Sequence, residues 1–123
     1  MNKSPGKGPI SIPLGVIGGS GAYDLLTNGA LGENVDTITL ETPFGKSAPI
    51  HHFRAGNLEY LFLSRHGEKD YSITAPFVNY RANIYALKEC GVGRIISWSG
   101  PGIINPSFKP GEYVLPSDII DET

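Results

Sequence analysis

The stretch Gly15-Val-Ile-Gly-Gly-Ser-Gly21 sets the interpretation of the chain, because a short apolar run ends there in a cluster of small residues. The run 14–17 is apolar and followed by glycines, which is typical of a buried strand, and we expect it to lie centrally in a sheet. Glycine permits positive φ angles and close backbone approach. The segment 22–26 can then begin a helix, whose free N–H groups favour negative charge. The stretch therefore predicts a strand, an anion-binding loop and a helix start.

The glycine cluster does not match either of the common nucleotide-binding motifs. No Gly-Lys-Ser/Thr follows it, as a P-loop requires, and the glycines at 15, 18 and 19 do not fit the G-x-G-x-x-G spacing. A tight strand-to-helix turn without a ligand explains the cluster equally well. From this stretch alone, an anion site and a simple turn remain equal alternatives.

The composition is that of one soluble globular domain, with 40% hydrophobic and 18% charged residues among 123. Its ten basic and twelve acidic residues are scattered, with a formal net charge of −2, so neither a nucleic-acid surface nor a membrane patch is expected. The single cysteine, Cys90, fits a reducing compartment and a cytoplasmic location. We expect residues 1–9 to form a disordered leader. No apolar run is long enough to cross a membrane.

Several short apolar runs predict strands. Residues 33–40 alternate imperfectly and predict an exposed or edge strand. The runs 50–54 and 58–63 are joined by a short turn and predict a hairpin. Residues 94–98 predict another strand, and 112–115 a last one that Pro116 would end.

One helix is predicted over 76–90. Its apolar stripe consists of Phe77, Tyr80, Ile84 and Leu87, widened by Val78, Ala82 and Ala86. Thr74 or Ala75 can cap its start, and Gly91 supplies the residue after its end. Strands alternating with a long helix predict an α/β fold, a mixed β-sheet flanked by helices.

Three glycine-containing breaks follow apolar runs: residues 18–21, Ser64-Arg-His-Gly67 and Ser99-Gly-Pro-Gly102. If the three strands are parallel neighbours, the breaks share the sheet edge where ligands gather in such folds. They offer backbone N–H groups, hydroxyls, a guanidinium and an imidazole, which together suit phosphate. A surface salt bridge for Arg65 and a structural role for His66 remain open as alternatives.

Other candidate residues favour structural roles. The adjacent pair His51-His52 should point to opposite faces of its strand, so we expect no metal site there. Cys90 has no histidine nearby in sequence and is expected in the core. Asn79 and Asn83 lie four residues apart on one helix face, where capping and ligand contact are both open.

Five motifs occur in order along the chain: Gly15-Val-Ile-Gly-Gly-Ser-Gly21, Thr42-Pro-Phe-Gly-Lys46, Arg65-His-Gly67, Val78-Asn-Tyr-Arg-Ala-Asn-Ile84, and Lys109-Pro-Gly111 followed by Asp118-Ile-Ile-Asp121. Their order and spacing resemble the methylthioadenosine phosphorylase branch of the trimeric purine nucleoside phosphorylases. The resemblance implies a phosphorylase/hydrolase-like α/β fold, of which residues 10–123 are the N-terminal part and incomplete. It also implies transfer of a ribosyl group from a purine nucleoside to inorganic phosphate, in purine salvage.

By this resemblance, six residues bind phosphate: Gly19, Ser20, Arg65, His66, Ser99 and Gly100. Inorganic phosphate is then a co-substrate, with no metal or organic cofactor. The aspartate that assists the leaving purine lies far into the second half of family members, and this chain stops before it, so no catalytic residue is assigned. The resemblance further implies a homo-oligomer, a trimer.

Two functions remain open for the chain itself. One is phosphorolysis of methylthioadenosine or a related purine nucleoside, with the choice between 6-amino and 6-oxo purines undecided. The other is a truncated, catalytically inactive relative that binds phosphate or a partner chain. Hydrolysis by water is a weaker alternative, because Arg65 and His66 would then lack an anionic ligand.

Overall fold

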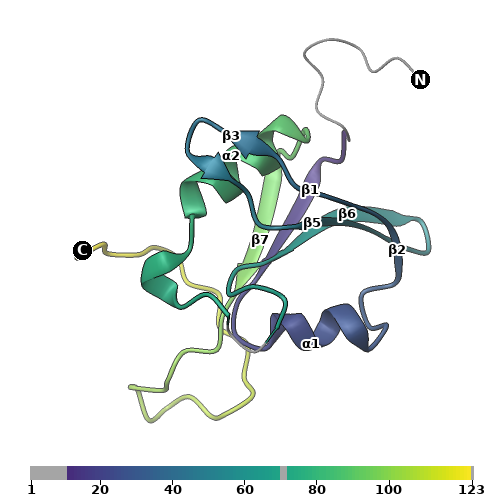
Figure 1. Cartoon of the computed structure of the whole chain (residues 1–123). Helices are drawn as coiled ribbons and strands as arrows, with labels where there is room; N and C mark the ends of the chain where they lie inside the picture. Colours follow the sequence, from purple (N-terminus) through teal and green to yellow (C-terminus); the bar gives the residue numbers. More distant parts are fainter. Residues whose placement is uncertain (1–10, 70–71, 123) are drawn as a thin grey trace, which may run out of the picture.

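A computed structural model of the chain describes residues 11–69 and 72–122, and the expected leader at 1–9 lies outside them. Its centre is a five-stranded sheet in these residues, with strand order β2-β5-β6-β1-β7 (Figure 1). Strand β1 (Leu14–Gly18) pairs in parallel with β6 (Leu58–Ser64) on one side and with β7 (Arg94–Trp98) on the other. The prediction of an interior strand beside the glycine cluster is therefore confirmed.

The other half of the sheet is antiparallel. Strands β5 (Ile50–Ala55) and β6 form the predicted hairpin, and β2 (Glu33–Ile38) pairs with β5 at the edge, as predicted. A register shift between Asn34 and Asp36 marks a bulge in β2. The sheet is thus mixed, and the α/β fold class is confirmed. A separate short ribbon of β3 (Glu41–Thr42) and β4 (Gly45–Lys46) encloses the turn expected around Pro43.

Helices α1 (Ala22–Thr27) and α2 (Tyr80–Glu89) pack on opposite faces of the sheet. Strand β6 contributes side chains to the cores on both faces, because alternate side chains of a strand point to opposite faces. Leu61 and Leu63 join the cluster beneath α2, whereas Tyr60 and Phe62 join the cluster that contains Ala22 of α1.

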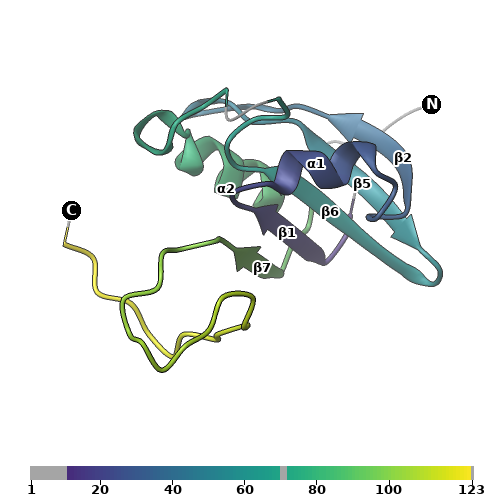
Figure 2. The same cartoon turned by 90° about the horizontal axis from the view of Figure 1, so that it is seen from below.

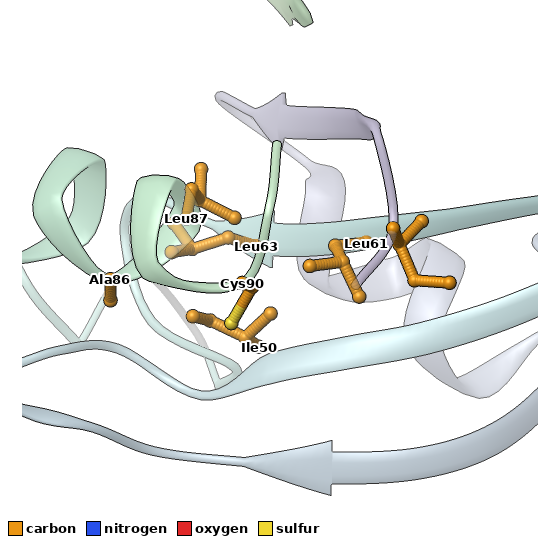
Figure 3. Packing of buried hydrophobic residues seen from close by; sticks show 7 residues of the cluster. Ile50, Leu61, Leu63, Ala86, Leu87 and Cys90 are labelled. Atoms are coloured by element: carbon orange, nitrogen blue, oxygen red, sulfur yellow. The ribbon is translucent and has the colours of Figure 1, made fainter. Parts of the chain in front are cut away.

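The core beneath α2 contains most of the large, fully buried side chains (Figure 3). Ile50, Leu61 and Leu63 of the sheet pack there with Leu87 and Cys90. Cys90 is fully buried, as predicted for a core residue. Burial, with a smaller contribution from the charge of Glu89, raises the pKa of its thiol.

The predicted helix over 76–90 is wrong at its start. Residues Ala75–Phe77 form a separate 3₁₀ turn, Val78 is extended, and α2 begins only at Tyr80. The Asn79 side chain accepts a hydrogen bond from the Ala82 N–H at 3.2 Å, so Asn79 is the cap in place of Thr74 or Ala75. Asparagine favours such a position because its side chain can satisfy a free backbone donor. Gly91, at φ +84°, follows the helix as predicted.

The helix buries Ala82, Ala86 and Leu87 of the predicted stripe, so the predicted buried face is confirmed in part. Its buried residues are Ala82, Asn83, Ala86 and Leu87, whereas Tyr80 and Ile84 of the predicted stripe are exposed. Phe77, also of the predicted stripe, belongs to the separate 3₁₀ turn and is exposed as well.

No strand forms over 112–115. A turn is present, with the Glu112 N–H donating to the Lys109 carbonyl, but Tyr113 and Leu115 after it are fully exposed. Figure 2 shows the chain after β7 running away from the sheet in open loops. The predicted strand lacks a partner strand within the described residues, and an isolated apolar run has no ladder to join.

Candidate functional site

The three predicted loops meet at one edge of the sheet. Because β1, β6 and β7 are parallel, their carboxyl ends lie together, and the loops after them are neighbours. Gly19 is the meeting point: a Cβ atom placed there would lie 2.5 Å from the Trp98 carbonyl oxygen, 3.0 Å from Arg65 Nη2 and 3.0 Å from Ser99 Cα. Only glycine allows the three loops to approach this closely. The prediction that the breaks share one edge is confirmed.

Arg65 is held at the centre of this edge. Its backbone N–H donates to the Gly18 carbonyl at 2.9 Å, which joins its loop to the glycine stretch. None of the ion pairs among the described residues involves Arg65, so the alternative of a surface salt bridge is not what the structure shows. Its Nε is buried and has no hydrogen-bond partner in this part of the chain. An unsatisfied cationic donor of this kind favours an anion beside it.

His66 lies behind Arg65 and is buried. Its Nδ1 is 3.0 Å from the Ile73 carbonyl, so this nitrogen carries a hydrogen and donates. Its Nε2 faces Arg65 Nη2 at 3.3 Å. His66 therefore has the structural role that the sequence left open, since it orients the guanidinium and fastens the loop to residue 73.

The remaining predicted site residues are more open to solvent. Ser20, Ser99 and Gly100 are all exposed. Gly21, at φ +78°, precedes α1, which is only six residues long. The structure brings together Gly19, Arg65, His66 and the backbone of Ser99, whereas Gly100 has no neighbour within 4 Å of a Cβ placed on it.

A pocket of about 140 Å³ opens beside Arg65, and the sequence did not predict it. It lies between α2 and the carboxyl ends of the parallel strands, lined by Ile17, Arg65, Val78, Tyr80, Asn83, Ile84 and Ser97. The apolar spacing predicts Val78 and Tyr80 on one buried stripe of a single helix. The capping preference of Asn79 was the signal that could have separated them.

The two asparagines of this region have structural roles. Asn79 caps α2, and its amide also donates to the Phe44 carbonyl at 2.7 Å. Asn83 is buried and accepts from the Ala48 N–H at 2.8 Å. Capping thus accounts for Asn79, while Asn83 both anchors the segment before β5 and lines the pocket.

The histidine pair is arranged as predicted, with the rings on opposite faces of β5. His51 lies near Phe53 and contacts Glu68, whereas His52 faces Glu59 at 3.7 Å. Within residues 11–69 and 72–122, no group of three potential metal-ligating side chains is present, and no helix is long and apolar enough to cross a bilayer.

These features define an α/β protein with a cationic, glycine-lined site at the carboxyl ends of its parallel strands. Residues 13–123 match the family model described as the phosphorylase superfamily. The chain belongs to this family, which confirms the predicted resemblance.

The similar proteins of known name are nucleoside phosphorylases. Over 110 residues the chain is 44% identical to the 6-oxopurine nucleoside phosphorylase of Pyrococcus furiosus, which covers 89% of this chain and 39% of that protein. Over 113 residues it is 44% identical to the S-methyl-5'-thioadenosine phosphorylase of Geobacter sulfurreducens, covering 89% of this chain and 37% of that one. The chain thus spans about two fifths of the length of these relatives.

A solved structure shows the same partial overlap. The methylthioadenosine phosphorylase from Schistosoma mansoni, in complex with tubercidin, superposes with a TM-score of 0.61 at 36% sequence identity. The match covers 71% of this chain and 29% of the other. The sheet with its site edge is therefore a phosphorylase-type fold, represented in part.

Proposed function

We propose that this chain supplies the phosphate half-site of a purine nucleoside phosphorylase-type pentosyltransferase. The observation that carries the proposal is the buried Nε of Arg65, which has no partner among the described residues and lies where the Gly19 loop and Ser99 meet. The names of the relatives support purine nucleosides as the class of substrate.

In this proposal Arg65 grips two phosphate oxygens, since its planar fork matches their spacing. The loop around Gly19 brings its amides close, and the exposed hydroxyls of Ser20 and Ser99 and the amide of Gly100 add donors at the rim. His66 keeps the guanidinium of Arg65 oriented through its Nε2.

The chemistry required of such a site is mainly positioning. One phosphate oxygen forms a bond to the anomeric carbon of the nucleoside while the bond from that carbon to the purine breaks, and the electron pair leaves with the base. The bound dianion stabilises the positive charge that develops on the sugar. Inorganic phosphate is then the co-substrate, without a metal or organic cofactor.

Relatives named for 6-oxopurine and for methylthioadenosine substrates are equally similar to this chain, at 44% identity each. The similarity therefore supports a purine nucleoside without choosing the base. A trimer and a cytoplasmic location are further parts of the proposal; they rest on the resemblance and on the single cysteine.

A second candidate function is phosphate binding without turnover. The exposure of Ser20, Ser99 and Gly100 favours it, because charge stabilisation in catalysis depends on a site that excludes water.

Both candidates are tested on the chain itself. Phosphate-dependent release of base from methylthioadenosine or inosine supports the phosphorylase, and phosphate binding by calorimetry without release of base supports the second candidate. Arg65→Ala should weaken phosphate binding by more than about tenfold, because charge-assisted hydrogen bonds are each worth roughly 1.5–3 kcal/mol. Arg94→Ala is the control, since Arg94 is exposed at the opposite end of the parallel strands. Equal affinity in wild type and Arg65→Ala would contradict both candidates.

A further inference from the structure

A polar cluster beside the site has no part in the proposed chemistry. It consists of Asn34 and Thr37 of β2, His51 of β5, and Glu68, which directly follows the Arg65-His66-Gly67 segment. His51 is buried among these groups, with its side chain 9% exposed. A buried ring that is hydrogen-bonded through both nitrogens fixes the groups around it.

The hydrogen bonds determine which ring nitrogen of His51 carries the hydrogen. The amide Nδ2 of Asn34, which can only donate, lies 3.2 Å from Nδ1, and the Thr37 hydroxyl lies 2.9 Å from the same atom. Nδ1 therefore accepts, and the hydrogen is on Nε2. Nε2–H donates to a carboxylate oxygen of Glu68.

The bulge in β2 makes this arrangement possible. In a regular strand, residues three apart point to opposite faces. The register shift between Asn34 and Asp36 brings Asn34 and Thr37 to the same face, where their side chains lie 3.1 Å apart, beside His51.

Glu68 in turn adjoins the turn that presents the site residues. In this turn the Ser64 hydroxyl donates to the Gly67 carbonyl at 2.5 Å, and the Gly67 N–H donates to the Ser64 carbonyl at 3.4 Å. Arg65 and His66 occupy the two central positions. Strand β6 holds the start of the turn, and the bond from His51 to Glu68 holds the chain just after it.

We propose that His51 is a positioning residue of the phosphate site, which acts through Glu68 to hold the Ser64–Gly67 turn with Arg65 directed at the Gly19 loop. The ligand in this inference rests on the proposed function, whereas the positioning rests on the contacts above.

Substitutions of Glu68 test the inference by the sign of their effect. A carboxylate near a phosphate site repels the anion, so removal of its charge alone would tighten phosphate binding. Positioning predicts the opposite for Glu68→Ala, a loss of affinity of about tenfold in calorimetry with inorganic phosphate. Glu68→Gln keeps an acceptor for the His51 N–H and should bind at least as tightly as wild type. Tighter binding by both variants would overturn the inference.

Glu59→Ala is the matched control. Glu59 is also a carboxylate beside a histidine of β5, with a side-chain exposure of 38% against 37% for Glu68, but it contacts His52 on the other face. This variant should leave phosphate affinity unchanged.

Amide hydrogen exchange without phosphate separates this inference from the proposed function. Glu68→Ala and His51→Leu should speed exchange at the Arg65 and Gly67 amides, whereas Glu59→Ala should not. If the wild type binds no phosphate, the proposed function fails, and the exchange rates still decide the positioning role. Unchanged exchange in both cluster variants would overturn that role.

Discussion

At the scale of single residues, Gly19 is the position on which the site geometry depends most directly. Gly19→Ala would place a methyl group 2.5 Å from the Trp98 carbonyl oxygen, and backbone cannot yield as a flexible side chain can. We expect a loss of roughly 1–3 kcal/mol in the free energy of unfolding, as for other overpacked sites. Phosphate binding should weaken as well, because the loops must separate. Urea titration and calorimetry measure the two effects.

Gly93→Ala is the control for this substitution. Gly93 is exposed, has no positive φ, and a Cβ there meets nothing within 4 Å. Its free energy of unfolding should change by less than about 0.5 kcal/mol. A Gly19→Ala variant as stable as Gly93→Ala would show that the close approach of the loops is wrong.

Cys90 allows a prediction about pH. Burial raises the pKa of its thiol above the ordinary value of 9.0. A group with a raised pKa in the folded state contributes its full stability below the unfolded-state pKa and loses it as pH rises. Wild type should therefore lose stability above pH 9.0 more steeply than Cys90→Ala, measured by urea titration at several pH values. Parallel pH profiles for the two proteins would contradict this.

The site could be predicted from the sequence only as far as its loops. The apolar runs before residues 18, 64 and 99 placed three strand ends together, and the structure confirms that Gly19 and Arg65 meet there. The cluster around His51 could not be predicted, because it depends on a bulge that reverses the side-chain alternation of β2. The orientation of His66 toward Arg65 could not be predicted either. It depends on the hydrogen bond to the Ile73 carbonyl, and the loop between these residues has no regular sequence pattern.

At the scale of elements, the start of α2 is the feature that the periodic pattern misplaced. Asn79→Ala removes the cap bond to Ala82 and the bond to Phe44, and should cost about 1–2 kcal/mol in free energy of unfolding. Asn79→Asp keeps the cap acceptor and loses only the donor to Phe44, so it should cost less. Thermal and urea denaturation compare the variants.

Thr74→Ala is the control at this element. Thr74 was a candidate cap in the sequence, but its side chain makes no capping hydrogen bond in the structure. We expect a change within about 0.5 kcal/mol. If Thr74→Ala destabilised as much as Asn79→Ala, the helix would begin where the periodicity placed it.

The strands and the start of helix α2 are determined by different features of the sequence. Strands β1, β5, β6 and β7 were predictable because each is a short run bounded by turn residues, and β2 because its imperfect alternation is typical of an edge strand. The apolar spacing from Phe77 to Leu87 fits a longer helix equally well. The Asn79 side chain, bonded to the Ala82 N–H and the Phe44 carbonyl, favours a helix that begins at Tyr80. Hydrogen bonds of one side chain to nearby backbone groups can thus outweigh the periodic apolar pattern.

At the scale of the whole molecule, the two edges of the sheet differ. Edge strand β2 carries Glu33 and Asp36 and a bulge, which are features that discourage pairing with other chains. Strand β7 forms the other edge (Figure 2). It is regular and exposed, and it presents Ile95 and Ile96, the latter 57% exposed. The segment 112–120, which follows β7 in sequence, carries further exposed apolar side chains. Most of the exposed large apolar side chains in the described residues therefore belong to β7 and the chain after it.

This asymmetry predicts where the chain associates. An exposed apolar edge strand templates pairing with another chain, and a charge placed on it opposes that pairing. Ile96→Lys should reduce concentration-dependent association in sedimentation velocity, with the fold retained by circular dichroism. Val35→Lys adds the same charge to the β2 edge at a residue that is 41% exposed, and should leave association unchanged because that edge is already protected. Equal effects of both variants would show that net charge, rather than the β7 edge, governs association.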